Sequence, residues 1–156
     1  LGPTSVLIDA PREVVFDQIA APYLGRKPAS LRAKLRVLEQ GRDMAVAEHR
    51  TKLPWMDAVT VEVVRFDRPG RVSFRLLRGP VPHVFEEFTL EEHDAGTLLH
   101  YRGELGADLW LLGRLYGGKV VRPVWERTVA ASLEEIKTGA EQRAAAHRRR
   151  RPTEAG

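Results

Sequence analysis

The chain has 156 residues, no cysteine, a hydrophobic share of 43% and a formal net charge of +4. This length predicts one domain, the composition is typical of globular proteins, and the absence of cysteine excludes disulfides and thiolate chemistry. No apolar run approaches the roughly 18 residues that a membrane-spanning helix needs, so we expect a soluble, cytoplasmic protein. Much of the positive excess lies in residues 148–151, which we interpret as a solvated chain end.

The N-terminal part predicts a strand followed by a helix. Residues 5–8 form a short apolar run typical of a strand. Pro11 then takes a first-turn helix position, where its missing N–H costs nothing. Pro22 and Gly25 end this helix, and residues 22–31 are predicted to be a loop with at most one helical turn.

From about Arg32 the apolar residues alternate with a period of two, which predicts strands joined by short turns. The strongest hairpin signal is the turn at residues 67–70, because Pro69 presets φ and Gly70 accepts a positive φ. Short connections favour an antiparallel meander. The predicted strands are residues 33–40, 44–52, 58–66, 72–78, 84–91 and 97–105.

One long amphipathic helix is predicted after the last strand, with Asp108 as its N-cap. Its apolar and small residues recur every three or four positions, from Leu111 to Ala140, which is the spacing of one helix face. The first half, as far as Trp125, is apolar on several faces, and we expect a kink at Pro123. We therefore look for a ligand beneath this first half.

This order of elements resembles the START-like or helix-grip superfamily, also called SRPBCC. The resemblance is carried by the strand-to-helix junction at residues 8–16, by the last hairpin at residues 88–101, and by the end of the long helix at residues 129–141. The nearest branch resembles the polyketide cyclase/dehydrase-like group of bacterial proteins. One departure concerns residues 23–28, which are a thin version of the family's second helix.

The resemblance implies an α+β helix-grip fold. Its curved antiparallel sheet of about seven strands wraps around a long C-terminal helix, with one or two short helices after the first strand. It covers residues 5–143, which we expect to form a single domain, followed by a basic, disordered tail at residues 144–156. It also implies a mostly apolar cavity between sheet and helix. Known members bind lipids, sterols, hormones or polyketides, and some catalyse cyclisation, aromatisation or dehydration.

Glu86 is the most informative candidate for chemistry, because alternation places it on one face with Phe88 and Leu90. Desolvation there would raise its pKa toward the range of a general acid or base. The alternative, which we favour from sequence alone, is a structural role, either as an ion pair with an arginine such as Arg75 or Arg102 or at a solvated rim of the cavity.

Tyr101 and His49 are the other two catalytic candidates, as a hydrogen-bond donor and a proton shuttle, although a structural role is the commoner one for both residue types. No metal site and no cofactor are expected, since no two histidines have metal-ligand spacing. The candidate ligand-binding residues are His49, Phe74, Leu76, Glu86, Phe88, Leu99, Tyr101, Leu111, Tyr116, Val121 and Trp125.

The leading hypothesis is a monomeric or homodimeric protein that binds a hydrophobic or amphipathic small molecule. The alternative is an enzyme of the polyketide cyclase, aromatase or dehydrase type. A nucleic-acid partner or membrane contact through the basic tail is the weakest hypothesis. A dry apolar cavity would favour binding, whereas polar groups that converge within hydrogen-bond reach, one with a perturbed pKa, would favour catalysis.

Overall fold

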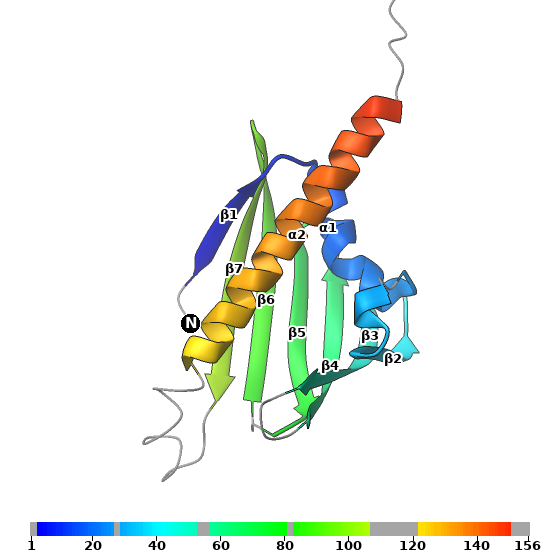
Figure 1. The fold of residues 1–156 in the computed structure, drawn as a ribbon, viewed down its shortest axis with the longest axis vertical. Coiled ribbons are helices and arrows are strands. Elements are labelled where there is room, and N and C mark those ends of the chain that lie inside the picture. Colours follow the sequence, from blue (N-terminus) through cyan, green and yellow to red (C-terminus); the bar gives the residue numbers. More distant parts are fainter. Residues whose placement is uncertain (1–2, 27–28, 53–56, 81–82, 107–121, 151–156) are drawn as a thin grey trace, which may run out of the picture.

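The computed structural model describes residues 3–26, 29–52, 57–80, 83–106 and 122–150. They form one curved antiparallel sheet of seven strands, with two α-helices against one of its faces (Figure 1). In chain order the elements are β1 (Thr4–Ile8), α1 (Arg12–Ala20), the 3₁₀ segments η1 (Ala21–Leu24) and η2 (Ala29–Leu31), β2 (Leu35–Gln40), β3 (Met44–Lys52), β4 (Asp57–Asp67), β5 (Arg71–Arg78), β6 (His83–His93), β7 (Gly96–Gly106) and α2 (Arg122–Arg150). The predicted helix-grip fold is confirmed.

The strand order in the sheet is β1-β7-β6-β5-β4-β3-β2. From β2 to β7 each strand pairs with its neighbour in the chain, as short turns require, and β1 pairs antiparallel with β7. The predicted meander is therefore correct, and its last strand is covered by the first. The end of the chain's first strand thus lies beside the start of its last one, with Ile8 opposite Thr97.

The segment between β1 and β2 is more ordered than the sequence predicted. Pro11 occupies the N-cap position of α1, one residue before the first turn in which we expected it, and makes no side-chain capping bond. The helix buries the face that carries Val15, Phe16 and Ile19. η1 follows directly and ends at Gly25, whose φ of 89° suits glycine. β2 begins two residues later than expected, since Lys34 N–H donates to the carbonyl of Leu31 in a turn.

Alternation along the strands assigns the inner face correctly. On β5, Val72 and Phe74 are buried, whereas Arg71 and Arg75 are exposed on the other face. The same rule gives a continuous core between the sheet, α1 and α2. The fully buried larger side chains are Tyr101, Phe16, Phe66, Ile8, Leu99, Val15, Val64, Val72 and Thr97.

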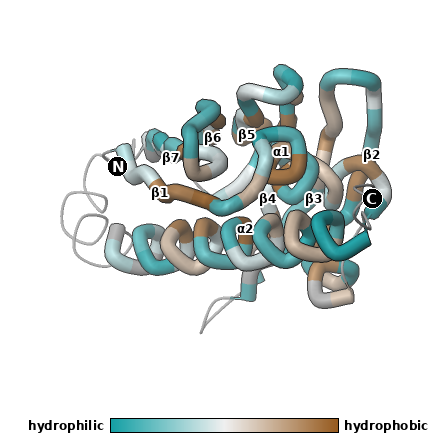
Figure 2. Tube along the Cα trace, turned by 90° about the horizontal axis from the view of Figure 1, so that it is seen from above, coloured by the Kyte–Doolittle hydropathy of each residue, from teal (hydrophilic) through white to brown (hydrophobic). Residues whose placement is uncertain are grey.

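The long helix α2 is described from Arg122 onward and runs diagonally across the inner face of the sheet (Figure 1). Seen from above, hydrophilic and hydrophobic residues alternate along it, as in a one-sided amphipathic helix (Figure 2). The expected N-cap Asp108 and the candidates Leu111, Tyr116 and Val121 lie outside the described residues. The kink at Pro123 stays a prediction, because a kink is defined by helix on both sides and the residues before Arg122 are not described. Neither described α-helix combines the length and the apolar character needed to span a membrane.

At its other end α2 continues past residue 143, where we expected the domain to end, as far as Arg150. The physical reason is packing: Ala140 and Ala144, one turn apart, are 0% and 3% exposed and extend the apolar stripe of the helix. Residues 144–150 therefore form helix rather than a disordered tail, and residues 151–156 lie outside the described part.

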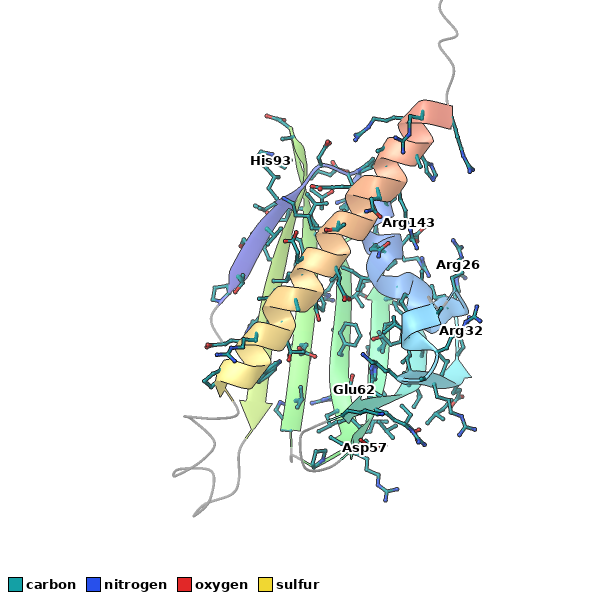
Figure 3. All side chains as sticks on the ribbon, in the orientation of Figure 1. Arg26, Arg32, Asp57, Glu62, His93 and Arg143 are labelled. Carbon is teal, nitrogen blue, oxygen red and sulfur yellow. The ribbon has the colours of Figure 1, made fainter. Side chains whose placement is uncertain are left out.

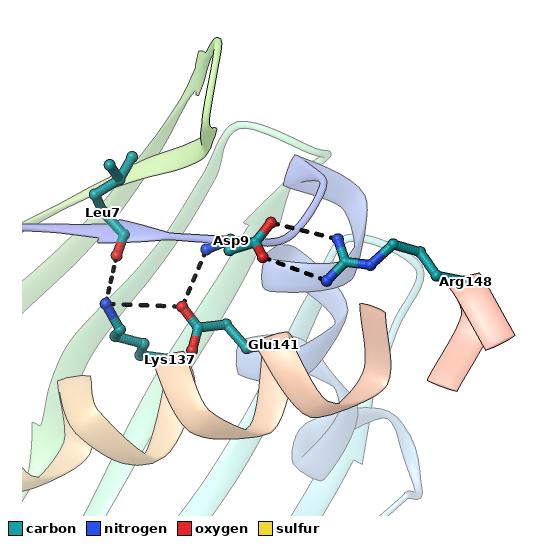
Figure 4. A network of polar contacts seen from close by, with 5 residues as sticks. All are labelled: Leu7, Asp9, Lys137, Glu141 and Arg148. Atoms are coloured by element: carbon teal, nitrogen blue, oxygen red, sulfur yellow. Dashed lines mark hydrogen bonds and ion pairs between the residues drawn. The ribbon is translucent and has the colours of Figure 1, made fainter. Parts of the chain in front are cut away.

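A polar network holds this half of α2 against β1 and the residue that follows it (Figure 4). The Lys137 ammonium donates to the carbonyl of Leu7 at 2.9 Å, and the backbone N–H of Asp9 donates to Glu141 Oε1 at 3.1 Å. Arg148 donates to both carboxylate oxygens of Asp9 at 3.3 Å. The helix is thus fixed to the edge of the sheet at the end away from Trp125.

Candidate ligand site on the inner face of the sheet

A row of aromatic side chains crosses the inner face of the sheet from η1 to β7. The ring centroids of Tyr23 and Phe74 are 5.5 Å apart, those of Phe74 and Phe88 5.8 Å, and those of Phe88 and Tyr101 5.2 Å. The rings are tilted or edge-on to one another, the arrangements that aromatic pairs prefer. We call these four residues the aromatic row.

Glu86 lies beside this row, directly opposite Phe74 on β5 and Gly103 on β7. Its Oε1 accepts a hydrogen bond from the Tyr101 hydroxyl at 2.6 Å and a longer one from Trp125 Nε1 at 3.3 Å. One carboxylate oxygen thus joins two strands of the sheet to α2.

The ion pair with Arg75 or Arg102 that we favoured from the sequence is wrong. Both arginines are exposed and lie on the opposite face, where Arg75 stands opposite Phe85 and Arg102 opposite Glu87. Because neighbouring strand residues point to opposite faces, an arginine at these positions cannot reach the Glu86 carboxylate without leaving its strand.

Gly103 makes room for this arrangement. A Cβ built on Gly103 would lie far inside van der Waals contact with the Tyr101 hydroxyl oxygen and 3.2 Å from Cζ2 of Trp125. The phenol of Tyr101 therefore lies along its own strand, over the glycine, and reaches the carboxylate on β6. No other residue type leaves that space.

Burial raises the pKa of Glu86, and the nearby charge of Glu62 adds to this rise, while the hydrogen bonds from Tyr101 and Trp125 oppose it. The pKa of Tyr101 is also raised, first by burial and then by the negative charge of Glu86. Tyr101 is consequently a neutral hydrogen-bond donor at neutral pH. Two polar groups thus lie within hydrogen-bonding distance beside the aromatic row, and one of them has a raised pKa, an arrangement found in both ligand sites and acid–base sites.

A second polar cluster on the same face contains Glu62, His49 and Tyr23. Glu62 accepts a hydrogen bond from Thr60 Oγ1 at 3.0 Å, and its other oxygen lies 3.6 Å from His49 Nε2. The Tyr23 hydroxyl lies 3.5 Å from the same nitrogen. Burial lowers the pKa of His49 and raises that of Glu62. The histidine is therefore neutral at neutral pH, and its contact with Glu62 is a polar contact of a neutral imidazole, not a salt bridge.

The sequence interpretation missed Glu62 and Tyr23. For Glu62 a signal existed, because it has the same parity as the buried residues Val64 and Phe66 on β4. Tyr23 lies in a segment without any period, and nothing in the sequence indicated that η1 would carry it into the core.

Glu62 lies toward the same end of the sheet as Asp57, and His93 is at the opposite end (Figure 3).

The described members of the predicted ligand-binding set all lie on the inner face. Phe74, Phe88 and Tyr101 belong to the aromatic row, and Trp125 faces them from α2 through its bond to Glu86. Leu76 is partly buried opposite Glu62, whereas Leu99 is fully buried between Val6 and Leu90 and belongs to the core.

Two further features bear on the choice of site. Within the described ranges, no group of three or more histidine, cysteine, aspartate or glutamate side chains could hold a metal ion. A hollow of about 660 Å³ lies at the far end of α2, where its charged lining residues include Asp9, Lys137, Glu141 and Arg148. Since these four side chains bind one another and the backbone of β1, we interpret this hollow as part of the docking of α2, not as the ligand site.

Solved structures of known proteins share this fold. The di-domain ARO/CYC StfQ from the steffimycin biosynthetic pathway superposes with a TM-score of 0.75 at 15% identity, over 92% of this chain and 51% of that one. The Zhui aromatase/cyclase from Streptomyces sp. R1128 gives 0.68 at 20% identity, over 91% and 93%. A START superfamily protein from Mycobacterium smegmatis gives 0.59 at 13% identity, over 93% and 97%.

At these identities the likeness concerns the fold, and the chain spans about half the length of the di-domain protein. No curated protein matches the chain. The family model described as polyketide cyclase / dehydrase and lipid transport matches residues 3–141, which is most of the sequence. The chain therefore belongs to this polyketide cyclase / dehydrase and lipid transport family.

Proposed function

We propose that this protein binds an amphipathic small molecule against the inner face of the sheet, with the ligand's apolar body on the aromatic row and its polar head at Glu86. The single observation that carries the proposal is the Glu86 carboxylate, partly buried beside four aromatic rings and held there by Tyr101 and Trp125. Ligand sites typically combine apolar walls with a few fixed polar groups of this kind.

The second carboxylate oxygen of Glu86, Oε2, supports the same proposal. Both hydrogen bonds end on Oε1, and Oε2 accepts none from the residues that the structure describes. A carboxylate has about four lone-pair sites, so this oxygen can still accept a donor from a ligand. Leu76 and His49 would extend the proposed surface toward β3.

The proposal is tested by denaturing the purified protein and identifying any released small molecule by mass spectrometry. Titration with 2-naphthalenemethanol, which has a flat apolar body and one hydroxyl, gives a direct measure of affinity. Phe88→Ala should weaken this binding at least about tenfold because it removes the centre of the aromatic row. Phe85→Ala, on the opposite face of the same strand, is the matched control and should bind like the wild type. Absence of any released molecule together with no binding of the probe would overturn the proposal.

An enzyme of the polyketide cyclase or dehydrase type is the second candidate, and the geometry of Glu86 and Tyr101 favours it. With its pKa raised, the Glu86 carboxylate can remove a proton from a carbon next to a ketone. The C–H bond breaks, its electron pair forms the enolate, and the proton stays on Glu86. Once Glu86 carries this proton, the Tyr101 hydroxyl can leave Oε1 and donate its hydrogen bond to the enolate oxygen instead.

This chemistry has a direct readout in deuterium exchange. The methyl protons of 2-acetylnaphthalene exchange with D₂O through the enolate, and the loss of their NMR signal measures the rate. An enzyme should accelerate exchange over the buffer, and Glu86→Gln should abolish the acceleration because an amide cannot take the proton. Glu87→Gln, on the opposite face of β6, should retain it. Equal rates with and without protein would remove this candidate.

A further inference from the structure

The proposed site carries negative charge and no fixed positive charge on the strands that form it. Glu62 and Glu86 both lie on the inner face, with the phenols of Tyr23 and Tyr101 beside them. From β3 to β7 the described inner-face positions contain no lysine or arginine. Arg78 lies opposite Val61, is exposed, and belongs to the outer face.

The acidic groups act on one another across this face. The charge of Glu62 raises the pKa of Glu86, so each carboxylate makes a further negative charge more costly. Tyr101 and Trp125 both donate to one oxygen of Glu86. Neither can donate to an anionic ligand without giving up that hydrogen bond. His49, the histidine of this face, has a lowered pKa and supplies no cation at neutral pH.

We infer that the polar head of the ligand is a hydrogen-bond donor, an ammonium or a hydroxyl, and that a carboxylate head is excluded by Glu86 and Glu62. This inference rests on the proposed function, because it concerns the same site. The Oε2 atom of Glu86, which accepts no hydrogen bond from the described part of the chain, is the acceptor for the donor head, and the aromatic row holds the flat or extended body. A ligand ammonium also supplies the countercharge that the described strands lack.

Four naphthalene probes with the same ring system test the inference. At pH 7.5, 2-naphthylmethylamine and 2-naphthalenemethanol are donors, 2-acetylnaphthalene is an acceptor only, and 2-naphthoate is an anion. Calorimetry or protein NMR should give the order amine, alcohol, ketone, acid, with the amine at least about tenfold tighter than the acid. Since all four share one apolar body, the differences isolate the head group.

Two variants connect this order to the carboxylates. Glu86→Gln should reduce the advantage of the amine over the acid by about tenfold, because the charge is removed and the shape kept. Glu62→Gln should reduce it in the same direction by a smaller factor, which keeps the test open if Glu86→Gln does not fold. Glu87→Gln, which alters only an outer-face contact with Arg71, is the matched control and should leave the order unchanged.

Each outcome decides a different point. Binding of the acid as tight as that of the alcohol would overturn the inference and leave the proposed function standing. A preference for the ketone over both donors would also overturn it and would favour the acid–base enzyme. An unchanged preference for the amine in both glutamine variants would overturn the role of the carboxylates. No binding of any probe to the folded wild type would overturn the proposed function itself and the inference with it.

Discussion

At the scale of single residues, Gly103 controls the contact between Tyr101 and Glu86. Gly103→Ala would place a methyl group where the Tyr101 hydroxyl lies and 3.2 Å from the Trp125 ring. We expect the phenol to leave Glu86, the unfolding free energy to fall by about 1–3 kcal/mol, and the affinity for 2-naphthylmethylamine to drop. Thermal unfolding and calorimetry measure the two effects. Gly70→Ala is the control, because Gly70 does not adopt the positive φ that the sequence predicted and a Cβ there meets nothing within 4 Å. Equal behaviour of the two variants would contradict this account.

Burial of Glu62 predicts a pH dependence of stability. Its pKa is raised in the folded state, so its contribution to stability is fully present below the unfolded pKa and is lost as the pH rises through the folded value. Glu62→Gln removes this loss, so the variant should gain stability relative to the wild type between pH 4 and neutrality. Urea unfolding at several pH values measures the difference. Asp57→Asn, an exposed carboxylate on the same strand, is the control, and an identical trend in both variants would refute the prediction.

The sequence predicted the face of β6 on which Glu86 lies, but not the residues that it contacts. Alternation along β6 is a local property and is visible in Glu86, Phe88 and Leu90. The bond to Trp125 joins residues 39 apart in the chain, and it depends on how α2 crosses the sheet. The approach of Tyr101 to Glu86 depends on the missing side chain of Gly103. The alternation of apolar and polar residues along a strand carries no information about such a space.

At the scale of elements, α2 contributes to stability beyond the expected domain end. A chain that stops at Arg143 loses the buried Ala144 and the contact of Arg148 with Asp9. We expect its unfolding free energy to fall by about 1–2 kcal/mol, since one buried methyl and an exposed ion pair are removed and the last turns of the helix are lost. A chain that stops at Arg150 keeps these contacts and serves as the control. Equal melting temperatures for both truncations would show that residues 144–150 are dispensable.

The strands could be predicted because each has an apolar face with a period of two and ends at a turn signal. β3 was predicted with its observed bounds, Met44–Lys52, since a glycine turn and a proline flank it. The 3₁₀ segments η1 and η2 could not, because their short apolar runs have no period and Tyr23 is buried only by tertiary contacts.

At the scale of the whole molecule, the two ends of the fold depend on each other. β1 covers the edge of β7, α1 packs against α2, and the core is shared by the sheet and both helices. We expect one cooperative unfolding transition. Circular dichroism at 222 nm reports the helices and near-ultraviolet dichroism reports the packed aromatic row, so the two urea curves should coincide. A loss of helix signal before the aromatic signal would show that α2 unfolds independently.

The network around Asp9 also indicates which substitutions the docking of α2 tolerates in this chain. Lys137 binds the backbone carbonyl of Leu7, a group that every residue type provides. Glu141 binds the backbone amide of Asp9, which every residue type except proline provides. Substitutions at Leu7 can therefore accumulate without changing where the helix docks. The same reasoning identifies position 9 as the one where a proline would remove a docking contact, since it has no amide hydrogen for Glu141. The placement of α2 on the sheet thus depends on the backbone at Leu7 and on both the backbone and the side chain at Asp9.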